Sequence, residues 1–210
     1  MFSLIKKVVY WIRRNYHEQT VLFLYRHARD KTTIVKDLVR WHVFLNVPDG
    51  QFKPSETLLR LFNQYEEYRN LFYFRLRNDP ITRHFVYRLA RQLFPPKSHL
   101  KIYAQENIGP GLFIQHGRAT GVVARRIGQN CWINQLVSIG FKDRSSRPPV
   151  LGNNVFVFAG AKVYGDITIG DNVVIGANAV VTKNVPPNCT VGGVPARIIK
   201  RDGRRVDEPL

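Results

Sequence analysis

The sequence predicts an α+β protein in which an α-helical domain precedes a parallel β-helix of hexapeptide repeats. The first observation is a period of six, because one segment places aliphatic residues at Leu151, Val157, Val163, Ile169, Ile175 and Val181. The second is a contrast in composition: 18 of the 25 aromatic residues lie in the first hundred positions, where no repeat is visible. The two parts of the chain are therefore expected to have different architectures.

The helical domain is expected to span residues 1–98. Its strongest element is an amphipathic helix that begins near Pro54 and carries apolar residues at helical spacing, namely Leu58, Leu61, Phe62, Tyr65, Tyr68, Phe72 and Leu76. Residues 3–28, 32–45 and 81–93 are predicted as further helices. Pro95 and Pro96 end the last of these, because proline lacks the backbone donor that a helix interior requires.

The β-helix is expected to span residues 99–200. A period of six suits a coil whose flat sides are each one hexad long, with the aliphatic residue pointing inward. Small residues after the aliphatic position, such as Gly176 and Ala177 after Ile175, permit tight corners between the sides. The same register continues toward the N-terminus at Ile102, Ile108, Ile114, Ile127, Ile133 and Ile139.

Two breaks interrupt this register. Thirteen residues, one more than two hexads, separate Ile114 from Ile127. Residues 141–149 have no central aliphatic residue and end in two prolines, so we interpret them as a loop that leaves the coil. Loops on a rigid scaffold often carry function. After the coil, residues 201–210 form a charged tail that is expected to fray.

Composition limits the class of protein. The widely spaced Cys131 and Cys189 do not form a metal-ligand spacing, and they indicate unpaired thiols in a reducing compartment. No transmembrane stretch and no signal-peptide pattern is present, so a cytoplasmic location is expected. The net charge of +17 suits a soluble basic surface, anionic ligands or an anionic membrane face. Nucleic acid is not expected as a partner, because no nucleic-acid-binding motif is present.

The N-terminal segment mixes basic and aromatic residues, namely Lys6, Lys7, Trp11, Arg13, Arg14 and Tyr16. Interfacial helices have this composition, so peripheral contact with the inner face of the membrane is one interpretation. A core-packing helix with snorkelling basic side chains is the other.

Three motifs of the coil resemble the hexapeptide-repeat acyltransferases. They are residues 108–116 (IGPGLFIQH), residues 119–123 (ATGVV) and the closing segment 192–199 (GGVPARII). Within these enzymes, the chain is most similar to the serine acetyltransferases and to their relatives that O-acetylate bacterial surface polysaccharides. The resemblance covers about half of the chain. It implies a left-handed β-helix, acetyl-CoA as the acetyl donor, no metal ion, and a homotrimer with active sites between subunits.

The resemblance makes His116 the catalytic base. An alcohol attacks poorly until a base removes its proton, and imidazole suits this role because its reference pKa is about 6.5. An isolated histidine at a coil corner is more often a simple polar residue, but the surrounding motif favours the catalytic interpretation. The other histidines lie before the coil and are interpreted as structural or surface residues: His17, His27, His42, His84 and His99.

The chain also departs from the serine enzymes. Gln115 and Lys101 stand where those enzymes have aspartates, and the loop after Gly140 lacks their histidine. Because carboxylates would compensate a substrate ammonium, their loss weighs against free serine as acceptor. The group that orients His116 is left open between Glu106 and Asp143, in the same or a neighbouring chain.

The resemblance also implies residues that contact acetyl-CoA. Gly140, Ala159 and Ala177 match backbone contacts to the pantetheine arm, although the small-residue requirement of the coil explains the two alanines equally well. Arg197 and Lys200 are expected to contact the CoA phosphates, as arginine and lysine commonly do, and a solvated terminal strand is the alternative.

These observations favour an O-acetyltransferase that acts on a sugar hydroxyl of a bacterial surface glycan or its precursor. Residues expected to contact the acceptor are Gln115, Arg118, Trp132, Asn134 and Asp143. Serine O-acetyltransferase of cysteine biosynthesis is the first alternative, with a small-molecule hydroxyl as acceptor. A non-catalytic β-helix scaffold is the second, and the motif around His116 weighs against it.

Overall fold

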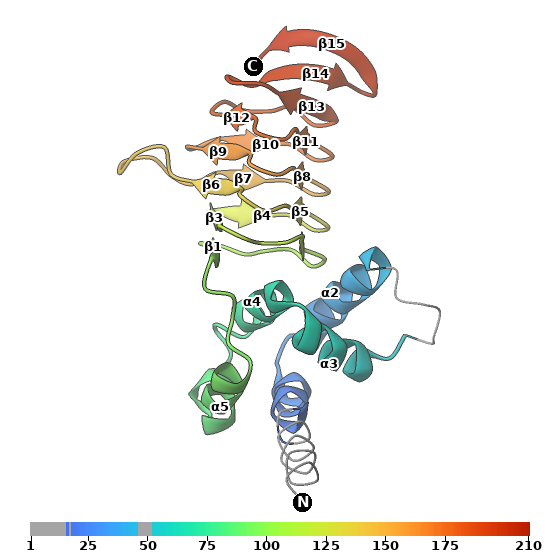
Figure 1. Cartoon of the computed structure of the whole chain (residues 1–210). Helices are drawn as coiled ribbons and strands as arrows, with labels where there is room; N and C mark the ends of the chain where they lie inside the picture. Colours follow the sequence, from blue (N-terminus) through green and yellow to red (C-terminus); the bar gives the residue numbers. More distant parts are fainter. Residues whose placement is uncertain (1–15, 17, 46–51) are drawn as a thin grey trace, which may run out of the picture.

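The structure, a computed structural model, describes residues 16, 18–45 and 52–210. Figure 1 shows a helical region at one end of a tall coil of short strands, with the C-terminus at the far end of the coil. No helix within these described ranges is long and apolar enough to cross a membrane. The predicted membrane-contact segment lies outside the described residues except for Tyr16, so that expectation stays a prediction.

Three sheets form the sides of the coil over the part of the chain that is described. One sheet contains β1 (Leu100–Ala104), β3 (Thr120–Ala124), β6 (Ser138–Gly140), β9 (Lys162–Tyr164) and β12 (Val180–Val181). The second contains β4 (Arg126–Ile127), β7 (Val150–Leu151) and β10 (Thr168–Ile169). The third contains β2 (Phe113–Ile114), β5 (Trp132–Ile133), β8 (Phe156–Val157), β11 (Val174–Ile175), β13 (Cys189–Gly192), β14 (Arg197–Arg201) and β15 (Arg204–Pro209).

The inward column of the coil is aliphatic, and the predicted fold class is confirmed. All six residues of the perfect repeat, from Leu151 to Val181, are at most 1% exposed. Parallel pairing places each above its counterpart in the next coil, as with Ile175 beside Val157. A coil can bury one aliphatic side chain per hexad only if every side has the same length, which explains the strict period.

Asparagines occupy several corners of the coil. Asn154, Asn172 and Asn188 have φ angles of +54° to +58°, a left-handed conformation that asparagine tolerates better than most residues. Their side chains form a ladder, in which Asn154 Nδ2 donates to Asn172 Oδ1 at 3.0 Å and Asn172 Nδ2 donates to Asn188 Oδ1 at 2.9 Å. Each corner therefore also links one coil to the next.

The helical region contains residues 18–27, α2 (Lys31–Phe44), α3 (Pro54–Gln64), α4 (Glu66–Arg75), the 3₁₀ helix η1 (Pro80–Arg83) and α5 (Phe85–Leu93). The predicted helix that begins at Pro54 is divided into α3 and α4 by Tyr65, whose backbone is extended. Arg69 Nε donates to the Phe62 carbonyl at 2.6 Å, which satisfies an acceptor at the end of α3. Apolar spacing alone did not predict this break, because Leu61, Phe62 and Tyr68 are buried on both sides of it.

The helical region is fastened to the first coil by buried polar contacts. Arg75 Nε of α4 lies 2.8 Å from Asp37 Oδ2 of α2, and the two side chains are 5% and 1% exposed. Arg75 also donates to the carbonyls of Ile108 and Gly109, while the Gly111 N–H donates to Asp37 Oδ1 at 2.6 Å. One ion pair therefore joins two helices to the turn that precedes β2.

The C-terminal residues do not fray as expected. β13, β14 and β15 pair in an antiparallel arrangement at the end of the coil, as Figure 1 shows. Ion pairs from Arg197 to Asp207 and from Arg201 to Glu208 join the last two strands. The charged residues that suggested a solvated tail therefore face one another across a hairpin.

Candidate active site

His116 lies on an enlarged corner of the first coil, between β2 and β3. Ile114 pairs with Ile133, and Val122 pairs with Ile139. Ile114 and Val122 of the first coil are eight positions apart, whereas Ile133 and Ile139 of the next coil are six apart. The following corner is shorter, with five positions from Val122 to Ile127. The thirteen-residue spacing seen in the sequence is thus an insertion of two residues at the His116 corner, partly offset afterwards.

The inserted corner has an unusual backbone and presses against the helical region. His116, Gly117 and Ala119 have φ angles of +61°, +24° and +47°. A Cβ atom at position 117 would lie 2.8 Å from Glu67 Cγ of α4, so only glycine fits there without displacement. The His116 side chain is exposed. The imidazole is thus presented on a corner whose position depends on α4.

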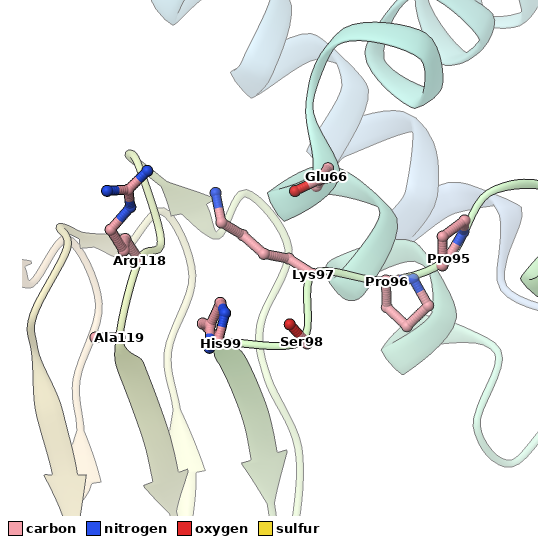
Figure 2. A pocket seen from close by; sticks show the side chains of 8 residues that line it. All are labelled: Glu66, Pro95, Pro96, Lys97, Ser98, His99, Arg118 and Ala119. Carbon is pink, nitrogen blue, oxygen red and sulfur yellow. The ribbon is translucent and has the colours of Figure 1, made fainter.

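A cavity of about 760 Å³ opens beside this corner. Figure 2 shows the side chains that line it. Arg118 and Ala119 of the corner line it, together with Glu66 of α4 and the segment from Pro95 to His99. Lys97 Nζ also lines it but lies 2.7 Å from Glu67 Oε1, so its charge is compensated. Glu66 and Arg118 have no ion-pair partner within 4 Å among the described residues. The cavity is therefore lined by one carboxylate and one guanidinium that are not engaged in an ion pair among the described residues.

The predicted acceptor residues fall into different surroundings. Arg118 lines the cavity, and Gln115 is half-buried next to His116. Trp132 Nε1 instead donates to Asn134 Oδ1 at 2.8 Å, and Asn134 is 8% exposed. The Trp132 ring packs against the rings of Phe44, Phe113 and Phe156. These contacts give Trp132 and Asn134 a packing role that the sequence analysis did not foresee.

Asp143 lies in the loop that leaves the coil between β6 and β7, and Figure 1 shows this loop projecting as predicted. Hydrogen bonds from Ser145 and Ser146 lower the pKa of the Asp143 carboxyl below its ordinary value. The carboxylate is thus engaged within its own loop. No described side chain, including Glu106 and Asp143, is hydrogen-bonded to the His116 imidazole. The orienting partner of His116 stays a prediction.

The predicted acetyl-CoA residues lie along the coil and at its end. Gly140 ends β6 beside the loop, and its carbonyl accepts from the Gly165 N–H at 3.0 Å. Ala159 and Ala177 lie on successive corners, where the Asn178 N–H donates to the Ala159 carbonyl. Arg197 Nε lies 2.7 Å from Asp207 Oδ1, so a phosphate would compete with that carboxylate.

Sequence reasoning missed Glu66 and His99, which both line the cavity. In the sequence, Glu66 looks like any acidic residue in the first turn of a helix, and His99 belongs to no motif, so neither carries a functional signal. His99 reaches the His116 corner because β1 pairs with β3, and the Thr120 N–H donates to the His99 carbonyl at 3.1 Å. Only long-range pairing brings these residues to the corner.

Other reactive groups are buried or dispersed. Burial raises the pKa of the Cys131 thiol to about 12, so this cysteine stays protonated at neutral pH. Within the described ranges, no group of three His, Cys, Asp or Glu residues is close enough to hold a metal ion. Two exposed imidazoles are therefore candidates for removing a proton here. His99 lines the cavity, and His116 lies on the corner whose Arg118 and Ala119 line it.

Comparisons with known proteins agree with this architecture. The profile of the family described as "Bacterial transferase hexapeptide (six repeats)" matches residues 148–183. All of the matched residues lie in the β-helix.

Among curated proteins, the chain is 46% identical over 125 residues to the serine acetyltransferase of Synechococcus elongatus, covering 57% of this chain and 50% of the relative. It is 47% identical over 124 residues to that of Staphylococcus xylosus, covering 57% and 56%. The chain thus spans about half the length of the curated relatives it matches.

Solved structures show the same fold over most of the chain. A serine acetyltransferase from Neisseria gonorrhoeae, in complex with serine, matches 90% of this chain and 82% of its own, with a TM-score of 0.61 and 23% identity. The Brucella abortus serine acetyltransferase matches 87% and 74%, with a TM-score of 0.61 and 26% identity. These relatives are not polysaccharide O-acetyltransferases, the branch that the sequence analysis favoured.

Proposed function

We propose that this chain is an acetyl-CoA-dependent O-acetyltransferase that uses His116 as general base. The acceptor hydroxyl would lose its proton to the imidazole while its oxygen attacks the acetyl carbonyl carbon. The carbon–sulfur bond then breaks, and the imidazolium returns the proton to the departing CoA sulfur. The observation that carries this proposal is the exposed imidazole on an inserted corner of a coil similar to those of serine acetyltransferases.

Serine is the acceptor that the comparisons support. The curated relatives are serine acetyltransferases, and one solved relative was crystallised with serine. The cavity lined by Arg118 and Ala119 of the His116 corner offers the two charged partners that the sequence motifs lacked, because Glu66 can pair with an ammonium and Arg118 with a carboxylate. A zwitterion needs both partners when it leaves water. This cavity therefore favours the amino-acid acceptor that was the first alternative.

A glycan hydroxyl is the second candidate acceptor. It is favoured by Gln115 and Lys101 at the positions where the serine enzymes carry aspartates, and by the loop 141–149, which has no histidine. An uncharged sugar would need hydrogen bonds rather than ion pairs. The acceptors therefore differ in how strongly they depend on the charges of Glu66 and Arg118.

Acceptor choice is tested by acetyl-CoA turnover with serine and with a panel of sugars and glycans. If serine is the acceptor, Glu66→Gln and Arg118→Gln should each raise its KM by about 10–100-fold, because each removes a charge-assisted contact. The KM for acetyl-CoA should change little. Glu56→Gln, on the exposed face of α3, is the matched control and should behave as the unmodified protein. Transfer to a glycan with no O-acetylserine formation would instead establish the second candidate.

A homotrimer is the proposed assembly. His116 is exposed and lacks an orienting partner among the described residues, so a neighbouring copy would have to complete the site. Two apolar side chains on the next corners, Leu136 and Phe158, are 51% and 41% exposed and are available for such a contact. Light scattering should give about three times the chain mass of 24.3 kDa. A monomer that retains full turnover would contradict the shared site.

A further inference from the structure

A second cavity, of about 440 Å³, adjoins the first at the segment between α5 and β1. The cavities share the lining residues Pro96, Lys97 and Ser98. The remaining wall comes from α4 and the turn after it, from α5 and from β1. The proposed acetyl transfer at His116 does not account for the residues that line this second cavity.

This cavity is lined by basic side chains without any acidic one. Arg77, Arg91 and Lys101 come from three different elements, and none of them pairs with a described carboxylate within 4 Å. Lys97 is the fourth basic residue, and Glu67 compensates it. Nearby Arg75 shows the contrast, because Asp37 neutralises it. Three positive charges therefore face one cavity without a partner.

Aromatic rings hold the two arginines in place. The Arg77 guanidinium carbon lies 3.8 Å from the centre of the Phe74 ring, and Arg77 Nη1 donates to the Phe74 carbonyl at 3.1 Å. Arg91 lies over the Tyr73 ring at 5.4 Å. Burial, followed by repulsion from Arg75, lowers the pKa of Arg77 below its ordinary value. Such preorganised guanidinium groups lose little entropy when they bind a ligand.

We propose that this cavity binds the phosphate or diphosphate group of a phosphate-bearing ligand. Guanidinium groups match phosphate oxygens in a bidentate geometry, and a diphosphate balances three cations better than a single carboxylate does. Tyr103, 53% exposed at the same cavity, adds a hydroxyl and a ring face for the remainder of the ligand. The proposal concerns binding only and does not depend on the acceptor of the acetyl group.

The test is titration calorimetry of the full chain with inorganic pyrophosphate at fixed ionic strength. Arg77→Gln and Lys101→Gln should each weaken binding by about tenfold or more, because each removes a charge-assisted contact. Arg88→Gln is the matched control, because Arg88 is exposed on α5, the helix that carries Arg91, and does not line the cavity. Arg77→Lys preserves the charge and should retain more affinity than Arg77→Gln. Thermal unfolding of every variant checks that the fold persists.

A second experiment distinguishes a lipid headgroup from a soluble molecule as the source of the phosphate. The same variants are sedimented with vesicles of phosphatidylcholine, with or without phosphatidylglycerol. A lipid headgroup as ligand predicts that Lys101→Gln reduces binding to the anionic vesicles, whereas a soluble ligand predicts an effect on pyrophosphate alone. No pyrophosphate binding, or an equal loss in Arg88→Gln, would overturn the proposal, because the latter would indicate only diffuse attraction by a basic surface.

Discussion

Replacing His116 with asparagine is expected to lower kcat by about 10²–10⁴-fold, the usual contribution of a general base. Asparagine is preferable to alanine here, because His116 has a φ angle of +61° and asparagine tolerates that conformation. The His116→Asn protein should keep its unfolding temperature and its affinity for CoA. His116→Ala should lose similar activity, with some added strain at the corner. Initial-rate kinetics with saturating acetyl-CoA measures the effect.

His99→Asn is the control that makes this result specific, since His99 lines the cavity beside the same corner. It should leave kcat within a few fold of the unmodified protein. The opposite pattern, in which His99→Asn abolishes turnover and His116→Asn does not, would transfer the role of base to His99. Near-normal turnover in both variants would remove histidine from the mechanism of this cavity.

Replacing Asp37 with alanine is expected to lower the free energy of unfolding by about 3–5 kcal/mol, because it leaves the charge of Arg75 buried without a partner. Asp37 is 1% exposed, and it also accepts the N–H of Gly111 at the base of the coil. The variant should therefore loosen the joint between α2, α4 and the first coil. Urea unfolding, followed by circular dichroism, measures the change.

Glu56→Ala provides the comparison for this experiment. Glu56 Oε1 lies 2.9 Å from Lys53 Nζ, but the Lys53 side chain is 58% exposed and the Glu56 side chain is 71% exposed. Solvent screens such a pair, so its loss should cost no more than about 1 kcal/mol. Similar small losses in Asp37→Ala and Glu56→Ala would show that the buried pair does not fasten the two regions together.

The sequence alone determined the β-helix. One inward aliphatic residue per hexad is a local requirement, because every side of the coil has the same length and repeats the same environment. Residues 151–181 therefore predicted the buried column, and the prolines at 148 and 149 predicted the loop. The motif around His116 predicted a catalytic role for this histidine, and that role stays a prediction.

The tertiary structure decided the features that depend on contacts distant in sequence. Tyr65 divides a continuous apolar pattern because α3 and α4 each pack their own buried face, and spacing does not reveal a change of direction. The last strands are joined by antiparallel backbone pairing among β13, β14 and β15, which places Asp207 and Glu208 opposite arginines of β14. Charge composition cannot distinguish such a hairpin from a solvated tail.

The candidate site also contains one residue that the sequence identifies and others that only the tertiary structure brings together. His116 has a sequence signature because its surrounding motif is contiguous in the chain. Glu66 has none, since it reaches the cavity only after α4 packs against the corner at Gly117 and β1 pairs with β3. The charges available to an acceptor were therefore decided by long-range packing, which brings a helical carboxylate and the Arg118 guanidinium to one cavity.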